Sequence, residues 1–176
     1  MRKKNAVIVV GPGVEDTEFS YPYYRLQEDY FFVDVASSGG IDVKGKHGLP
    51  IKANIDIKNL NAQNYDLVII PGGLESPDRL RQIPELLQFI REMNENNKVI
   101  GSICHGPWVL ISAKIVENRK MTIYKGCKDD LINANGIYID ESVVIDRNIV
   151  TSPHFRDNAI WMKNLLDLYY KISNNL

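Results

Sequence analysis

The stretch "VIGSICHGP", residues 99–107, decides the fold of this chain. It begins with the apolar pair Val99-Ile100, and residues 99–103 predict a strand. The run stops at Cys104-His105-Gly106, and the residues that follow, with Val109, Leu110 and Ala113, predict a helix. A strand that leads through a tight turn into a helix is the joint from which α/β proteins are built, so the stretch predicts that class.

The same alternation of strand and helix continues on both sides of this stretch. The pattern between residues 41 and 57 is weaker and predicts only short β pieces, and residues 146–148 predict a hairpin turn. Apolar runs predict strands at 6–10, 31–36 and 67–70, and helical spacing predicts helices at 16–28, 83–97, 128–134 and 156–172. The chain shows no repeat or linker, so we expect one domain over residues 1–176 with a mostly parallel sheet.

Composition indicates a globular protein that acts on small molecules. The chain has 176 residues, of which 44% are hydrophobic and 24% charged, and its net charge is -1. That balance gives no electrostatic case for nucleic acid or an anionic membrane, and no apolar run approaches the ~20 residues of a membrane span. Cys104 and Cys127 are the only cysteines. They are too few for a disulfide framework, so we expect a reducing, cytoplasmic location.

Four segments follow predicted strands and carry polar side chains. They are "GPGVEDTE" (11–18), "PGGLESPDR" (71–79), "CHGP" (104–107) and "SPHFRD" (152–157). In a parallel sheet, ligands bind beyond the carboxyl ends of the strands. The first three segments should therefore meet at one edge, and the fourth joins them only if its strand runs in the same direction.

Cys104 is the best candidate for a nucleophile. A tight turn between strand and helix exposes its side chain, and a helix N-terminus favours the thiolate, so we expect a lowered pKa. The residues alone leave open that Cys104 is simply buried, as unpaired cysteines often are. His105 could be its base, although neighbours on a helix do not face one another. His154 is a rival, and His47 reads as a surface residue.

Glu15 and Glu18 begin the helix predicted at 16–28, where carboxylates stabilise the helix dipole. If Glu15 points at Cys104, its pKa would be raised and it could transfer a proton. Asp16 reads as a cap or a solvated side chain. The chain lacks both glycine-rich phosphate-binding fingerprints and any metal-ligand spacing, so we expect no cofactor and no metal.

Five motifs together resemble the PfpI/ThiJ family, the intracellular protease I branch of the class I glutamine-amidotransferase-like superfamily. The likeness runs from about residue 6 to residue 168 and rests most on "ICHGP" combined with "VEDTE". The resemblance implies a flavodoxin-like three-layer α/β/α sandwich. The motifs are "AVIVVGPGVEDTEFSYPYYRL", "GKHG", "DLVIIPGG", "VIGSICHGPWVLISA" and "KDDLINANG".

The resemblance also implies roles for particular residues. Cys104 is the nucleophile, Glu15 its acidic companion and His105 its catalytic partner. Asp78, with Glu75 as the alternative, is the acidic residue that a neighbouring subunit contributes in dimers that assemble into hexamers. Apart from the resemblance, we expect Gly72, Gly73, Tyr124 and His154 to contribute to substrate binding. The chain departs from the family pattern at Pro153-His154, where relatives commonly carry an arginine that only Arg156 could replace here.

The family's activities imply a cysteine-dependent hydrolase, protease, glyoxalase or deglycase that attacks a carbonyl carbon of a small or peptide substrate. One alternative is a redox-sensing or chaperone-like stress protein that uses oxidation of Cys104. Another is a small-molecule or flavin binding module. A glutamine amidotransferase is disfavoured, because Phe155 and Arg156 follow His154 where that triad needs His-x-Glu.

Overall fold

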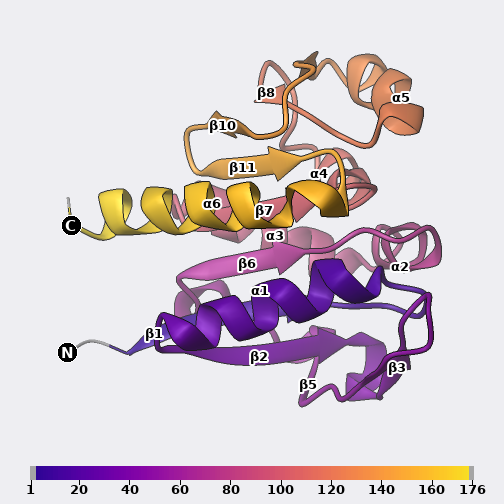
Figure 1. The fold of residues 1–176 in the computed structure, drawn as a ribbon, viewed down its shortest axis with the longest axis vertical. Coiled ribbons are helices and arrows are strands. Elements are labelled where there is room, and N and C mark those ends of the chain that lie inside the picture. The colour runs from indigo at the N-terminus through magenta and orange to yellow at the C-terminus, as the bar shows by residue number, and fades with distance from the viewer. Residues whose placement is uncertain (1–2, 175–176) are drawn as a thin grey trace.

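A computed structural model describes residues 3–174 of the chain (Figure 1). Its strands are β1 (Lys4–Val9), β2 (Phe31–Ser37), β3 (Val43–Lys44), β4 (Pro50–Ile51), β5 (Ile55–Asp56), β6 (Leu67–Ile70), β7 (Val99–Ile103), β8 (Lys120–Met121), β9 (Ile137–Tyr138), β10 (Val144–Asp146) and β11 (Ile149–Ser152). Its α-helices are α1 (Asp16–Glu28), α2 (Glu75–Leu80), α3 (Pro84–Glu95), α4 (Pro107–Ser112), α5 (Lys128–Asn133) and α6 (Asn158–Ser173).

Seven strands form the central sheet in the order β10-β11-β7-β6-β1-β2-β5. All neighbours in it are parallel except the hairpin of β10 and β11. The predicted α/β class and mostly parallel sheet are therefore confirmed. Because β11 runs parallel to β7, the fourth candidate segment reaches the same edge as the other three.

Helices cover both faces of the sheet, which gives three layers. Figure 1 shows α1 and α6 in front of the sheet and α3 and α4 behind it. Each face of the sheet has its own hydrophobic core, and side chains of β1 pack into both. Val7 and Val9 pack towards α3 and α4, while Ala6 and Ile8 pack towards α1 and α6. Burial on both faces explains why the central strands are continuous apolar runs.

Most element boundaries agree with the sequence prediction, and the differences have local causes. Helix α3 starts at Pro84, a residue favoured in the first helical turn, and ends before Asn97, whose φ of 53° is left-handed. Residues 155–157 form a separate 3₁₀ turn, so α6 begins at Asn158. Helix α2 starts within the segment "PGGLESPDR", for which the sequence pattern predicted no helix.

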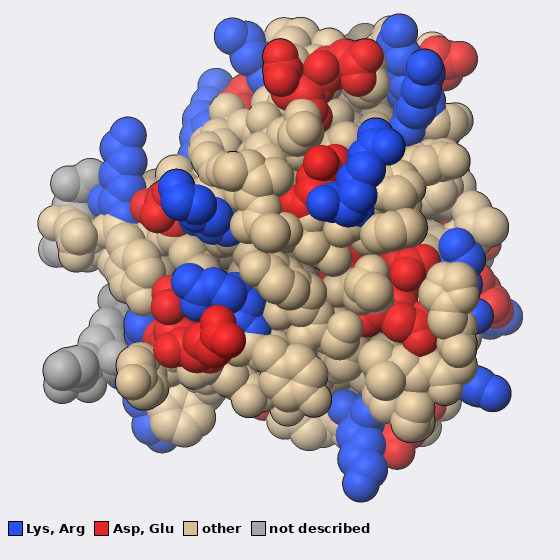
Figure 2. Space-filling view, in the orientation of Figure 1, with Lys and Arg blue, Asp and Glu red and all other residues tan. Residues whose placement is uncertain are grey.

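The surface in front of the sheet carries charges of both signs. Figure 2 shows Lys and Arg side chains interspersed with Asp and Glu side chains on this face, separated by uncharged residues. One such group joins Arg25 to Glu28 and Asp29 at the end of α1. Within residues 3–174, no helix has the length and apolar character that crossing a membrane requires.

Candidate active site

Cys104 lies in the turn between β7 and α4 with a left-handed backbone, φ 61°. That conformation is unfavourable for a residue other than glycine and persists only where the surroundings fix it. Two hydrogen bonds do so here: the Cys104 amide donates to the Ser152 carbonyl at 2.9 Å, and the Tyr124 amide donates to the Cys104 carbonyl at 2.9 Å. The turn therefore aims the Cys104 side chain at the edge where the four predicted segments meet.

His105 contacts the sulfur of Cys104, with 3.2 Å between Sγ and Nδ1. The rule that helix neighbours face apart does not apply, because Cys104 precedes the helix and has a left-handed backbone. The His105 ring stacks on Tyr124 with centroids 4.6 Å apart and meets the edge of Trp108 at 5.1 Å. Burial, and then the charge of Lys46, lower the pKa of His105, so its neutral form is favoured.

The carboxyl group beside the sulfur belongs to Glu18, which corrects the expectation that Glu15 would point at Cys104. Glu18 is fully buried, hydrogen-bonds with the Cys104 thiol and accepts the Gly72 amide at 2.7 Å. The physical reason is helix geometry, since Glu18 lies on the face of α1 that packs against the sheet. Glu15 precedes α1, and its Oε2 lies 3.5 Å from Lys46 Nζ and 3.5 Å from His47 Nε2.

Burial raises the pKa of Glu18 to about 7, although the Gly72 amide opposes the shift. Its Oε1 is buried and has no hydrogen-bond partner within residues 3–174, which further disfavours a full negative charge. Near neutral pH, Glu18 is therefore in a position to hold a proton next to the sulfur.

Burial and the negative charge of Glu18 raise the pKa of the Cys104 thiol, which corrects the expectation of a lowered value. The backbone N–H groups of His105 and Gly73 work in the opposite direction by donating hydrogen bonds to the sulfur. The charge repulsion disappears when Glu18 is protonated. The two groups are thus coupled, and a proton on Glu18 favours the thiolate of Cys104.

The glycines after β6 allow the backbone to approach Cys104. A Cβ at Gly72 would lie 2.6 Å from the Cβ of Cys104 and 2.6 Å from Glu18 Oε2. Gly73 has φ +90°, which other residues rarely adopt. These two positions therefore require glycine for packing and conformation, and Gly73 also brings its N–H to the sulfur.

A cavity of about 200 Å³ opens above Cys104. One side is a row of rings, with Tyr124 between His105 and His154, and His154 against Phe155. The lining also contains two charged side chains, Glu15 and Lys46. The full lining is Glu15, Lys46, Gly73, Leu74, Cys104, His105, Tyr124, His154 and Phe155.

The structure thus brings together most of the residues that the sequence predicted for the site. Gly72 lies behind Cys104 and does not line the cavity, and Asp78 is exposed on α2, outside the lining in its own chain. Sequence reasoning missed Glu18 as the partner of sulfur, and it missed the cavity residues Lys46, Leu74 and Phe155. These three cavity residues lie in segments quoted above, "GKHG", "PGGLESPDR" and "SPHFRD", which were the available signals.

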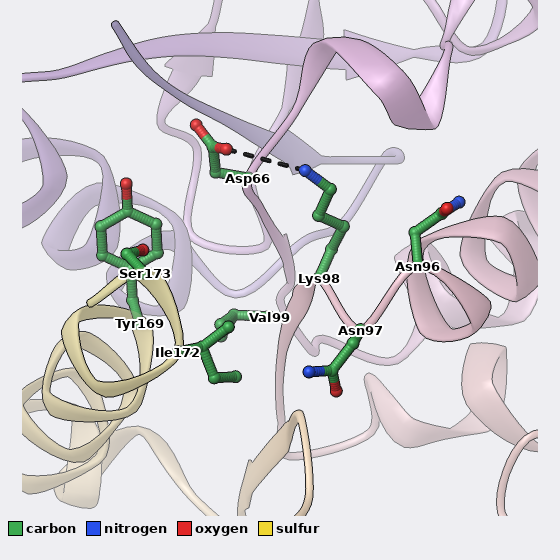
Figure 3. A pocket seen from close by; sticks show the side chains of 8 residues that line it. All are labelled: Asp66, Asn96, Asn97, Lys98, Val99, Tyr169, Ile172 and Ser173. Carbon is green, nitrogen blue, oxygen red and sulfur yellow. Dashed lines mark ion pairs between the residues drawn. The ribbon is translucent and has the colours of Figure 1, made fainter. Parts of the chain in front are cut away.

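A second hollow lies at the opposite edge of the sheet (Figure 3). It occupies about 70 Å³ beside Asp66 and Lys98, whose Oδ1 and Nζ are 3.8 Å apart. These residues precede β6 and β7, so the hollow lies at the amino ends of the strands, away from Cys104.

The described part of the chain contains no group of three His, Cys, Asp or Glu side chains that could hold a metal ion.

Fold and site together define an α/β protein with a cysteine at a strand-to-helix elbow, flanked by a histidine and a buried glutamate. Residues 4–168 match the model of the DJ-1/PfpI family, and the chain belongs to that family.

Three similar proteins illustrate the relationship. "Deglycase PfpI" of Pyrococcus furiosus is 39% identical over 154 residues, which cover 88% of this chain and 92% of that protein. "Putative cysteine protease YraA" of Bacillus subtilis is 39% identical over 153 residues, 86% of this chain and 90% of that one. A solved two-domain protein from Anabaena variabilis, with a DJ-1/ThiJ/PfpI-like and a ferritin-like domain, aligns with a TM-score of 0.91 and 35% identity over 94% of this chain. This chain spans 48% of that longer one.

Proposed function

We propose that the protein is a cysteine-dependent enzyme that attacks carbonyl carbons, with glyoxalase- or deglycase-type activity. The observation that carries the proposal is the position of Cys104 Sγ, 3.2 Å from His105 Nδ1, hydrogen-bonded with Glu18 and open to a cavity. A nucleophile, a base and a proton-holding acid within contact distance are the groups that covalent carbonyl chemistry needs.

The proposed reaction begins when the Cys104 sulfur attacks the carbonyl carbon of the substrate, with its proton taken up by Glu18 or His105. The bond between sulfur and carbon forms, and the carbonyl oxygen takes a proton to give a hemithioacetal. With methylglyoxal, a proton then moves from one carbon to its neighbour through an enediol. Addition of water to the resulting thioester releases lactate and returns the thiol, so no external oxidant or reductant is consumed.

The names of relatives support this class of reaction. The Pyrococcus protein carries the name "Deglycase PfpI" and the Bacillus protein the name "Putative cysteine protease YraA". The size of the cavity, about 200 Å³, favours a small reacting group over a flavin, because sites for drug-sized ligands occupy about 300–1,000 Å³. The second candidate, a redox sensor, is supported by the placement of Glu18, whose protonated form could donate a hydrogen bond to an oxidised sulfur.

The deciding experiment measures turnover of methylglyoxal, glyoxal and peptide substrates by the wild type, Cys104→Ser and Cys127→Ser. Cys127 is also buried but lies in the core on the other side of the sheet, so its replacement is the matched control. We expect Cys104→Ser alone to abolish turnover. Equal activity of wild type and Cys104→Ser would overturn the proposal. No turnover, together with oxidation of Cys104 under mild peroxide, would favour the redox sensor.

A further inference from the structure

The orientation of the His105 ring depends on the residues that pack against it. The torsion between Cβ and the ring of a histidine is broad, so the side chain alone does not hold Nδ1 in a fixed position. Tyr124 stacks on the ring, with centroids 4.6 Å apart and an angle of 21° between the ring planes. Trp108 meets the ring at 75°, with centroids 5.1 Å apart. The ring therefore cannot turn and move Nδ1 away from the Cys104 sulfur unless Tyr124 or Trp108 also moves.

These two neighbours of His105 are held in different ways. Tyr124 is fixed through its backbone, because its amide donates to the Cys104 carbonyl. Trp108 lies in the first turn of α4, and its ring is fixed through the indole nitrogen, since Nε1 donates to Asp130 Oδ2 at 2.9 Å. Asp130 lies on α5, so a separate helix holds the ring that packs against His105.

A cation also contacts the Trp108 ring. The Cζ atom of Arg81 lies 5.4 Å from the centroid of that ring, within the range of a cation–π contact. The Arg81 side chain is itself oriented, because its Nε donates to Ser112 Oγ at 2.9 Å. The indole ring is thus fixed both at its nitrogen and across its face.

We propose that Trp108 and Asp130 are positioning residues, which keep Nδ1 of His105 directed at the Cys104 sulfur. Neither residue lines the cavity, so the contact between the two rings is what connects them to the reaction. The effect on turnover rests on the proposed function, in which His105 moves protons, whereas the orientation of the ring can be measured without substrate. Misplacing a group that transfers protons slows the chemical step without weakening substrate binding, so we expect an effect on kcat and not on KM.

The first test measures His105 itself. Its Cε1–H resonance is followed by proton NMR as a function of pH and is assigned with His105→Gln. Burial lowers the pKa of His105 from its usual 6.5. Asp130→Ala removes the acceptor of the indole N–H, and a ring released towards water should have a pKa closer to 6.5. Loss of a negative charge alone would shift this pKa downward, so a rise reports movement of the ring.

Matched variants separate the hydrogen bond from general effects of charge. Asp129→Ala removes an exposed carboxylate from the same helix and should leave the pKa of His105 unchanged. Asp130→Asn keeps an oxygen acceptor and should restore most of the wild-type behaviour. Trp108→Phe keeps a ring but loses the donor, so it should reproduce the effect of Asp130→Ala, and combining the two changes should add little. An equal response to Asp129→Ala and Asp130→Ala would overturn the inference.

Kinetics with methylglyoxal separate this inference from the proposed function. We expect Asp130→Ala to lower kcat about tenfold, with KM within about twofold of the wild type, and Asp129→Ala to keep the wild-type kcat. Turnover by the wild type, with kcat unchanged in Asp130→Ala, would overturn the role of the two residues and leave the proposed function standing. A rise in the pKa of His105 without turnover by any of the proteins would overturn the function and leave the positioning of the ring standing.

Discussion

At the scale of single residues, the chemistry of the site depends on how Cys104 and Glu18 divide one proton. A carboxyl group with a pKa of about 7 is half protonated near neutral pH, so the charge beside the sulfur changes within the physiological range. When Glu18 loses its proton, the negative charge opposes formation of the thiolate. The reactivity of Cys104 is therefore set by its carboxyl neighbour as well as by its own burial.

Glu18→Gln should remove the effect that ionisation of Glu18 has on the reactivity of Cys104. In the wild type, the rate at which iodoacetamide alkylates Cys104 should show an inflection near the pKa of Glu18, about 7. The glutamine variant keeps the size of the side chain but cannot ionise, so its pH profile should lack that inflection. Glu15→Gln is the control, since Glu15 lies in the cavity lining and pairs with Lys46 instead of the sulfur. An unchanged inflection in Glu18→Gln would show that another group titrates.

Glu18 should also make the free energy of unfolding depend on pH. Its pKa is about 7 in the folded protein against a usual 4.5, so the folded state holds the proton more tightly. The free energy of unfolding should therefore fall as pH rises from about 4.5 to about 7, by about 3 kcal/mol. Urea unfolding at several pH values would measure this. Glu18→Gln should lack that part of the slope, and an equal slope in both proteins would contradict the assignment.

The residue scale also shows how far the sequence could predict the site. Cys104 and His105 could be placed because their motif joins a strand to a helix. Glu15 and Glu18 could not be separated, since both lie at the start of the predicted helix, where a carboxylate stabilises the helix dipole. Only the exact position of α1 against the sheet decides which carboxyl group reaches the sulfur. The raised pKa of the thiol also depends on packing that no short motif records.

At the scale of elements, α1 and the β3–β4 hairpin are held together by one carboxylate. Asp16 accepts the amide of His47 at 2.8 Å and that of Leu49 at 2.9 Å. These bonds fix the loop that carries Lys46 to the cavity. The expectation that Asp16 caps the helix or is solvated is therefore incomplete, because its partners lie more than thirty positions along the chain.

Asp16→Ala should loosen this loop. Loss of two hydrogen bonds at about 1 kcal/mol each should speed hydrogen exchange at the His47 and Leu49 amides and lower kcat/KM. Asp42→Ala is the control, since the hydrogen bond that Asp42 accepts comes from the Ala53 amide and not from His47 or Leu49. Unchanged exchange at His47 and Leu49 in Asp16→Ala would contradict the role.

Arg119 joins the segment before β8 to the β10–β11 hairpin. It donates to Asp146 Oδ1 at 2.9 Å and also contacts Asn94 and Asn148, while its side chain is only 6% exposed. Arg119→Met should leave Asp146 without its buried partner and lower the free energy of unfolding by about 3–5 kcal/mol. Arg147→Met should change it by less than about 0.5 kcal/mol, because Arg147 is 76% exposed. Chemical denaturation would compare the two, and similar losses would contradict the assignment.

At the scale of the whole molecule, the order of the strands could not be predicted from the sequence. The sequence pattern identified β1, β2, β6 and β7 of the central sheet, and hydrophobic burial on both faces follows from their apolar character. Nothing in this pattern says that β11, near the end of the chain, lies beside β7 or that β1 lies between β6 and β2. Such neighbours are set by crossover connections and by packing of helices that are distant in sequence.

The oligomeric state of the protein also belongs to this scale. Asp78 is exposed on α2 and lies outside the lining of the cavity in its own chain, so a catalytic role would need a second subunit. We expect sedimentation to find a dimer or a larger oligomer, and Asp78→Asn to lower kcat while Asp167→Asn, also exposed, does not. A monomer that retains full activity would remove Asp78 from the site.

The two hydrogen bonds that fix Cys104 also determine when the site can form during synthesis. Their partners, Tyr124 and Ser152, are made after the cysteine, as are His154 and Phe155 of the cavity. A chain that has emerged only as far as α4 contains Cys104, His105 and Glu18 but lacks the neighbouring strand β11 and the ring that stacks on His105. The elbow is therefore completed only when the last third of the protein folds onto the sheet. A nascent or truncated chain would carry the cysteine without its reactive environment, so reactivity appears only after folding of the sheet is nearly finished.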